Sequence, residues 1–125
     1  MSDLQVLRTA LDDANALVIT LVGRNKIEES RANATRLCER MHREERAGLV
    51  MDYRRCALDH TVAQFAEIAE IFAAGMPAGV RIAYIYGEAN FIHAATMTKQ
   101  LAKAGFPARA FTDFEAAAAF VRDVA

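Results

Sequence analysis

The segment from Gly48 to Thr61 reads Gly-Leu-Val-Met-Asp-Tyr-Arg-Arg-Cys-Ala-Leu-Asp-His-Thr, and the rest of the chain is organised around it. Its apolar start, Leu49-Val50-Met51, predicts a short buried strand that ends at Asp52. A polar connection follows, and Asp59-His60-Thr61 opens a long helix over about Val62 to Ala74. Open α/β sheets place binding and switch residues beyond the carboxyl ends of their strands, so this segment is the first candidate for a functional site.

A β-hairpin is predicted upstream of this segment. Leu4 to Leu11 and Ala16 to Val22 are strand candidates, and only the turn formers Asp12-Asp13-Ala14-Asn15 separate them. That connection is too short for anything but a hairpin turn. Both faces of the second strand are apolar apart from Thr20, which is typical of a central strand covered on two sides.

A helix is expected between the hairpin and the central segment. Gly23-Arg24-Asn25 ends the second strand, and Asn25 with Glu28 three residues later predicts a cap for a helix from about Lys26 to Arg46. The apolar positions of this helix form one stripe, Ile27, Ala34, Leu37, Cys38 and Met41. Its charged residues occupy the opposite face, which indicates a solvated surface rather than a nucleic-acid patch.

Two strands and two helices are predicted after the helix over Val62 to Ala74. That helix has an inward stripe of Val62, Phe65, Ile68, Ala69 and Phe72. The strand Val80 to Tyr86 leads into a helix over Phe91 to Ala104, and Ala108 to Phe111 is the last strand. The stripe of the helix over Phe91 to Ala104 is Phe91, Ala94, Ala95, Thr98, Leu101 and Ala102. Thr112-Asp113-Phe114-Glu115 predicts a capping box before a final helix from Glu115 to Val124.

The predicted element order is therefore ββαβαβαβα. One antiparallel hairpin followed by strands joined through helices predicts an α/β fold with a mixed, mostly parallel five-stranded sheet. The chain has 125 residues and no linker, repeat or low-complexity tract. We therefore expect a single domain over residues 1–125.

Composition excludes several classes of function. An apolar fraction of 54% and a charged fraction of 25% are ordinary for a globular protein, and a net charge of -1 gives no electrostatic case for nucleic acid. The start of the chain lacks the pattern of a signal peptide, and no apolar run is long enough for a membrane span. Cys38 and Cys56 lack CxxC spacing, so reduced thiols in a cytoplasmic protein are expected.

The carboxyl ends of the parallel strands gather the candidate functional residues. The predicted interaction surface consists of Asp52, Arg54, Arg55, Asp59, His60 and Thr61. Thr61 is the candidate phospho-acceptor, because a phosphate at a helix start meets free backbone N–H groups and the positive helix end. Phosphorylation would add about 1.5 to 2 negative charges beside the two aspartates, with the arginines partly compensating. A compatible alternative is that Thr61 and Gln64 form only a capping box.

No catalytic residue, metal ligand or cofactor-binding loop is predicted. His42, His60 and His93 are not spaced to share a metal ion, and no nucleophile motif accompanies any of them. Surface positions are therefore expected for all three histidines. The glycines lack the spacing of nucleotide-binding loops. These observations favour a protein without enzymatic activity, metal or cofactor.

Two tyrosines offer an alternative site. Tyr84 and Tyr86 share one face of their strand with Ile82. If helices cover this face only partly, the two rings would form the floor of an apolar pocket or a dimer interface. If helices cover it fully, the rings are core residues whose hydroxyls are satisfied at the rim.

Taken together, these segments resemble the STAS domain, and within it the SpoIIAA-like branch described as STAS/Sec14-like. The resemblance rests on Gly48-Leu-Val-Met-Asp52, on Leu58-Asp59-His60-Thr61 and on Ala110-Phe111-Thr112-Asp113 before an Ala-rich helix. The second of these segments stands where the anti-sigma-factor antagonists carry an Asp-Ser-Ser motif. The resemblance implies that Asp59 is the motif aspartate and that Thr61 stands at the phosphorylated serine, whereas His60 replaces the first serine and Val62 the usual glycine.

The resemblance implies a cytoplasmic, non-catalytic regulatory or protein-interaction module whose partner is an anti-sigma-factor or kinase-like protein. Sec14-like relatives imply the alternative, a module that binds a small apolar molecule or a lipid on the face of Tyr84 and Tyr86. A hairpin edge strand could also pair with a second copy of the chain, so a homodimer stays open.

Overall fold

The computed structural model describes residues 4–123 and confirms the predicted order of strands and helices. The strands are β1 (Leu4–Leu11), β2 (Ala16–Asn25), β3 (Gly48–Leu58), β4 (Arg81–Ile85) and β5 (Ala108–Phe111). The α-helices are α1 (Ile27–Arg43), α2 (Val62–Gly75), α3 (Phe91–Lys103) and α4 (Phe114–Arg122). Two short 3-10 helices, η1 (Asp12–Ala14) and η2 (Glu88–Asn90), complete the described part of the chain.

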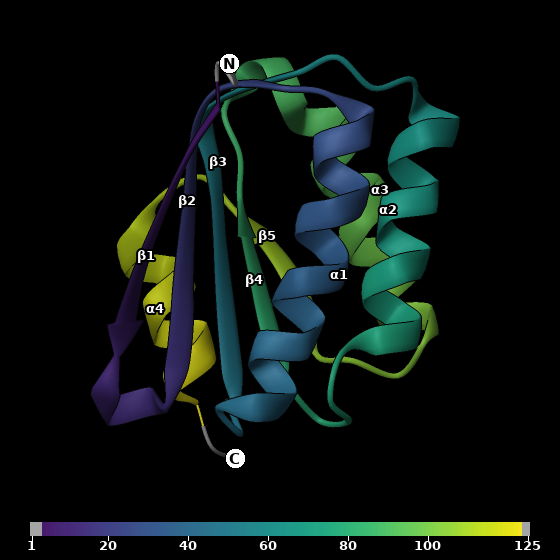
Figure 1. The fold of residues 1–125 in the computed structure, drawn as a ribbon. Helices are drawn as coiled ribbons and strands as arrows, with labels where there is room; N and C mark the ends of the chain where they lie inside the picture. The colour runs from purple at the N-terminus through teal and green to yellow at the C-terminus, as the bar shows by residue number, and fades with distance from the viewer. Residues whose placement is uncertain (1–3, 124–125) are drawn as a thin grey trace.

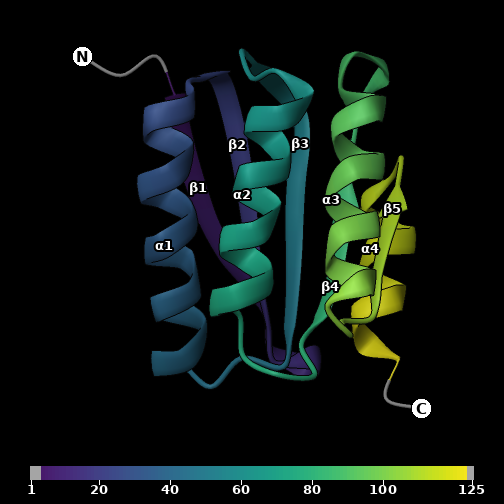
Figure 2. The same ribbon diagram turned by 90° about the vertical axis from the view of Figure 1, so that its right-hand side faces the viewer.

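The five strands form one mixed sheet in the order β1-β2-β3-β4-β5. β1 is antiparallel to β2, and the remaining neighbours are parallel, as the sequence predicts. The hairpin turn is closed by Asn15 in the left-handed conformation, with a φ of 49°. Helices α1, α2 and α3 cover one face of the sheet and α4 covers the other (Figures 1 and 2).

The larger core lies between the sheet and the three helices α1 to α3. Tyr84 is 0% exposed in this core, and its ring packs against Tyr53 at 4.7 Å and Phe65 at 6.3 Å between centroids. Tyr86 is half-buried against Phe91. The interpretation of the Tyr84 and Tyr86 face as a pocket floor is therefore wrong for Tyr84, because the helices cover its side chain completely.

Strands β2 and β3 are longer than predicted. They stay paired as far as Asn25 and Leu58, well beyond the last pair of β3 with β4 at Asp52 and Ile85. The register shifts between the pairs Thr20–Asp52 and Val22–Arg55, so β3 contains an extra residue. The bulge carries polar residues within the strand, which is why the sequence indicated a connection there.

Two predicted helix caps differ from the structure. Asn25 belongs to β2 and its side chain is buried, so α1 begins after Lys26 without a side-chain cap. The cap of α4 is Asp113, whose carboxylate accepts a hydrogen bond from the backbone N–H of Ala116 at 2.8 Å. The predicted end of this helix, Val124, lies outside the described residues.

Candidate interaction surface

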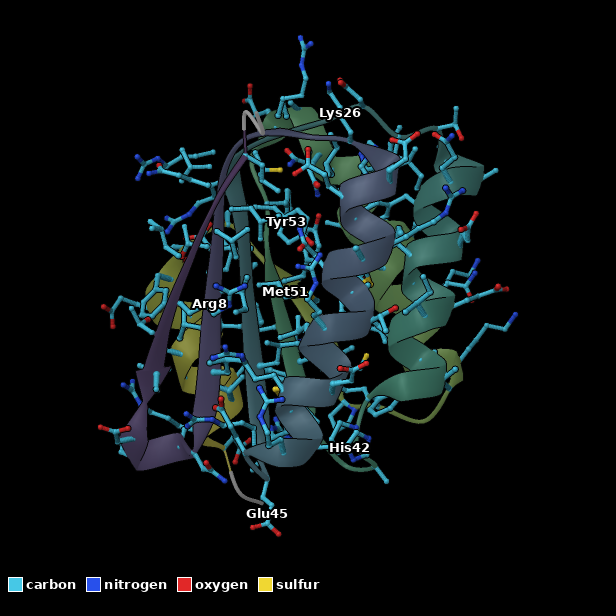
Figure 3. The ribbon with its side chains drawn as sticks, in the orientation of Figure 1. Arg8, Lys26, His42, Glu45, Met51 and Tyr53 are labelled. Atoms are coloured by element: carbon cyan, nitrogen blue, oxygen red, sulfur yellow. The ribbon has the colours of Figure 1, made fainter. Side chains whose placement is uncertain are left out.

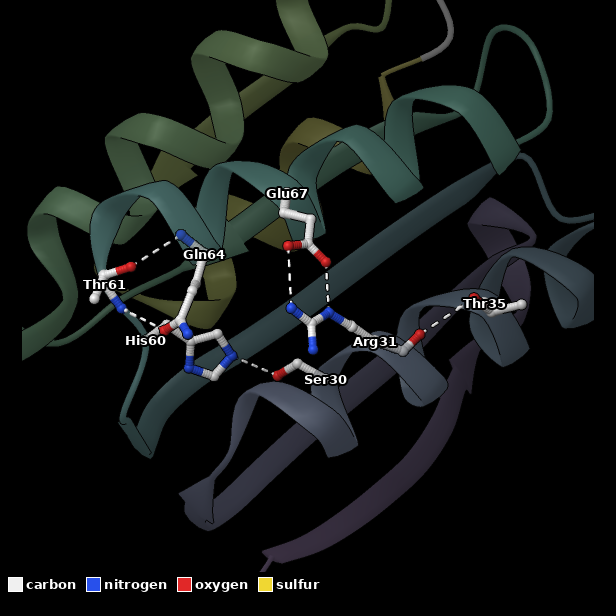
Figure 4. Close-up of polar contacts among 7 residues, drawn as sticks. All are labelled: Ser30, Arg31, Thr35, His60, Thr61, Gln64 and Glu67. Atoms are coloured by element: carbon white, nitrogen blue, oxygen red, sulfur yellow. Dashed lines mark hydrogen bonds and ion pairs between the residues drawn. The ribbon is translucent and has the colours of Figure 1, made fainter.

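Thr61 caps α2. Its Oγ1 accepts a hydrogen bond from the backbone N–H of Gln64 at 3.1 Å, and Gln64 Oε1 accepts one from the backbone N–H of Thr61 at 3.0 Å (Figure 4). This reciprocal pair confirms the predicted capping box. The side chain of Thr61 is exposed, so the helix start is both fixed in position and open to other molecules.

His60, which precedes the cap, is buried, so its predicted surface position is wrong. It is 7% exposed, and its Nε2 lies 2.7 Å from the hydroxyl of Ser30 in α1. His93 of α3, itself half-buried, donates from its Nε2 to the carbonyl oxygen of His60 at 3.2 Å. The ring of Phe65 packs edge-on against both imidazoles, at 5.8 Å from His60 and 4.9 Å from His93. These contacts fix the start of α2 between α1 and α3.

The Ser30–His60 pair does not form a catalytic triad. The sequence did not predict this pair because Ser30 lies on a different helix, 30 residues before His60. A nucleophile–base pair is oriented by a third group hydrogen-bonded to the other ring nitrogen, and among the described residues His60 Nδ1 has no such partner. Its evident role is to hold α1 against the start of α2.

Burial makes His60 a source of pH-dependent stability. Burial lowers the pKa of His60 below its ordinary value, and the positive charges of His93 and Arg31 lower it further. The negative charges of Asp59 and Glu28 oppose this shift but do not cancel it. As the pH falls below about 6.5, the unfolded chain takes up a proton that the folded chain does not, so folding stability decreases.

We therefore expect the free energy of unfolding to fall between pH 7 and pH 5, by at most about 1.4 kcal/mol per pH unit for this one group. His60→Gln is expected to flatten that slope in urea titrations, with the exposed His42→Gln as the control for losing an imidazole. An unchanged slope in His60→Gln would show that another group is responsible.

Asp52 belongs to the β3 bulge rather than to an exposed edge. It is 7% exposed, and its carboxylate accepts hydrogen bonds from the Arg54 backbone N–H at 3.1 Å and from the Arg54 guanidinium at 3.0 and 2.8 Å. Burial alone would raise the pKa of Asp52, but these bonds and the charge of Arg54 outweigh it and lower the pKa below its ordinary value. Asp52 therefore fixes the bulge and is largely withdrawn from any partner.

Arg54 and Arg55 are exposed but do not join Thr61. They lie between Tyr53 and Cys56, which both belong to the core under α1 to α3, so the two arginines project toward the α4 side of the sheet. The negative charge of Asp113, at the start of α4, acts on Arg54. The predicted interaction surface is thus divided between the two faces of the sheet.

Asp59 stays beside Thr61. It is exposed and pairs with Arg24 at 3.4 Å. Of the six predicted surface residues, Asp59 and Thr61 are the two that share the exposed start of α2.

Three apolar side chains missed by the sequence prediction lie at the same end of the molecule. Val62 is 53% exposed in the first turn of α2, while Phe91 and Ile92 are 58% and 60% exposed in the first turn of α3. Val62 and Phe91 were predicted as buried stripe positions, and both predictions are wrong. The first turn of each helix has fewer neighbours to cover it than the turns packed on the sheet.

The two helix starts lie next to each other because His93 of α3 is bonded to His60 just before α2 (Figure 2). We call Asp59, Thr61, Val62, Phe91 and Ile92 the helix-start surface. Leu7 on β1, 47% exposed, is the remaining large exposed apolar side chain among the described residues. Exposed apolar side chains that gather at one end of a molecule are typical of a protein-binding surface.

Metal-ligating side chains and thiols could also carry chemistry in residues 4–123. No cluster of three or more His, Cys, Asp or Glu side chains there is arranged to hold a metal ion. Burial raises the pKa of the Cys38 thiol to about 11 and that of Cys56 to about 12, so both are protonated at neutral pH. None of the described helices combines the length and apolar character needed to cross a membrane.

A comparison with solved structures identifies the same fold in another protein. A crystal structure of an anti-sigma factor antagonist from Mycobacterium paratuberculosis superimposes with a TM-score of 0.68, covering 96% of this chain and 95% of that chain, at 15% sequence identity. No protein-family model and no protein with a curated description matches the sequence. The chain therefore has the fold predicted from its resemblance to STAS domains.

Proposed function

We propose that this protein is a non-catalytic regulatory module of the cytoplasm, which binds a protein partner through the helix-start surface and is released by phosphorylation of Thr61. The observation that carries the proposal is the exposure of Val62, Phe91 and Ile92, three large apolar side chains in the first turns of α2 and α3. The fold shared with an anti-sigma factor antagonist supports it. By the same resemblance, the partner is an anti-sigma-factor or kinase-like protein.

The apolar side chains supply the affinity in this proposal. Fully burying a Val, Ile or Phe side chain contributes about 1.5–3 kcal/mol, so three half-exposed ones contribute roughly half of that each. Asp59 and its partner Arg24 lie at the edge, where charges favour specificity more than affinity. The hydrogen bonds of His60 to Ser30 and His93 fix the start of α2, so this part of the surface is already ordered in the unbound protein.

Phosphorylation of Thr61 would change the surface without unfolding it. Phosphate oxygens accept hydrogen bonds from the first-turn N–H groups of a helix, so they would replace the lost Oγ1 cap. The same group would place about 1.5 to 2 negative charges beside Val62 and close to Asp59. Covering that charge with an apolar partner surface would require its dehydration, which is unfavourable. The complex would therefore dissociate.

Native mass spectrometry of the protein isolated from its own cells tests this proposal. We expect two populations, an unmodified chain bound to a protein partner and a free chain that carries one phosphate on Thr61. Thr61→Ala should show only the first population. A phosphate on Thr61 in the intact complex, or a partner-bound fraction unchanged after phosphatase treatment of a phosphorylated sample, would contradict the switch.

A further inference from the structure

A cavity of about 230 Å³ lies between α1 and the sheet, and it is lined by residues of α1, β1, β2, β3 and α2. Figure 3 shows Met51 and Tyr53 between the strands and α1, and Arg8 over β1 and β2. The floor is apolar and comes from the sheet and α2: Val6, Ile19, Leu21, Met51, Tyr53 and Phe72. None of the five residues of the helix-start surface lines this cavity, and neither does Tyr84.

The cavity follows from the side chains that α1 presents to the outer strands. Where α1 faces the cavity, it carries Ser30, Asn33 and Ala34, which are too small to fill the space above β2. The next larger apolar side chain on this wall, Leu37, is only half-buried. An apolar floor therefore stays accessible from solvent along one side of the helix.

The rim of the cavity is positively charged. Arg8 comes from β1, and Arg36, Arg40 and Arg43 come from α1, against Glu39 as the one acidic residue of the lining. Arg40 pairs with Glu44 at 3.4 Å, but within residues 4–123 the other three arginines form no ion pair. The whole chain has a net charge of -1, so four arginines against one glutamate are a local excess of positive charge at this cavity.

A buried polar group in the lining favours a second feature in a ligand, a hydrogen-bond donor. Asn25 is 2% exposed and lines the cavity, and its Oδ1 has no hydrogen-bond partner among the described residues. An unpaired buried carbonyl oxygen is unfavourable, so a hydrogen-bond donor placed against it is stabilising. The lining thus combines an apolar floor, a positively charged rim and one buried hydrogen-bond acceptor, Asn25 Oδ1.

We propose that this cavity binds a small amphipathic carboxylate, whose apolar chain lies on the sheet and whose carboxylate pairs with the arginine rim. Arginine presents a planar fork of donors that matches a carboxylate. The volume is below the roughly 300–1,000 Å³ typical of sites for drug-sized ligands, which suits a chain of about ten carbons. A hydroxyl on that chain would donate to Asn25.

Isothermal titration calorimetry of the full chain tests the proposal with three probes of equal chain length: decanoate, decanol and decyltrimethylammonium. The two ionic probes are used below their micelle concentrations and decanol below its solubility limit. We expect decanoate to bind, decanol to bind at least tenfold more weakly and the cation not to bind. Decanoate binding should move the amide NMR signals of Ile19, Ala34 and Tyr53.

Arg8→Gln/Arg36→Gln removes two rim charges that form no ion pair, and we expect it to weaken decanoate binding at least tenfold. Arg109→Gln, an exposed arginine on β5 away from the cavity, is the matched control and should bind as the wild type does. No binding of decanoate, equal affinity for decanoate and decanol, or unchanged affinity in the double variant would overturn the proposal.

Discussion

Replacing Thr61 with glutamate is expected to weaken binding of the protein partner at least tenfold, which corresponds to about 1.4 kcal/mol or more. The carboxylate would introduce a permanent charge beside the exposed Val62, in the first turn of α2. Folding should change little, since the lost Thr61 cap, worth about 1 kcal/mol, is partly offset by the favourable placement of a negative charge at a helix start.

Two further substitutions distinguish the effect of a negative charge at position 61 from the effect of losing the helix cap. Thr61→Ala should retain partner binding but lose about 1 kcal/mol of stability, because Oγ1 no longer accepts from Gln64. Thr61→Ser preserves the hydroxyl and should match the wild type in both respects. Affinities by biolayer interferometry and urea unfolding of the same samples provide both readouts. Equal affinity for the Glu and Ser variants would rule out a charge switch at Thr61.

Phe65→Ala is expected to cause the largest loss of stability, about 3–5 kcal/mol. Phe65 is 1% exposed, and its ring contacts those of His60, His93 and Tyr84. Removing it leaves a cavity at the point where α2, α3 and the sheet meet. Urea unfolding followed by circular dichroism measures the effect.

The control for this substitution is Phe91→Ala. Phe91 is 58% exposed and packs only on Tyr86 among aromatic residues of the described chain, so its loss should cost no more than about 1 kcal/mol. Phe65→Leu provides an intermediate variant in case the alanine variant does not fold. Similar losses for Phe65→Ala and Phe91→Ala would contradict the packing described for the start of α2.

The element order was predictable because local patterns determine it. The apolar and β-branched run from Val80 to Tyr86 fits few structures other than a strand. The turn formers after Leu11 likewise fit few structures other than a turn. The capping box at Thr61 was predictable for the same reason, since both of its hydrogen bonds lie within four residues. Such short-range features need no knowledge of the rest of the fold.

The composition of the site was harder to predict because it depends on long-range contacts. Arg54 and Arg55 resemble loop residues in the sequence, and only pairing with β2 shows that they lie in a bulge within a strand. The burial of His60 depends on Ser30, which the sequence places on another helix. Helical periodicity assigned Phe91 to the buried stripe, although a first turn can extend past the layer that would cover it.

The cavity beneath α1 could not be predicted from the sequence either. Its arginines come from β1 and from three positions of α1, and in the sequence they look like a solvated helix face. The inner acceptor, Asn25, was predicted as a helix cap because it precedes a helical pattern. Asn25 is buried because β2 extends as far as this residue, which places the Asn25 side chain under α1.

The most direct test of the proposed docking surface is quantitative affinity purification of tagged variants from the protein's own cells. Phe91→Ser/Ile92→Ser removes most of the apolar part of the helix-start surface, and Leu7→Ser removes a similarly exposed apolar side chain on β1. We expect a protein partner to be recovered with the wild type and with Leu7→Ser, and to be lost with the double variant while that variant stays folded by circular dichroism. Equal recovery of every bound protein with the double variant and the wild type would contradict a docking role for the starts of α2 and α3.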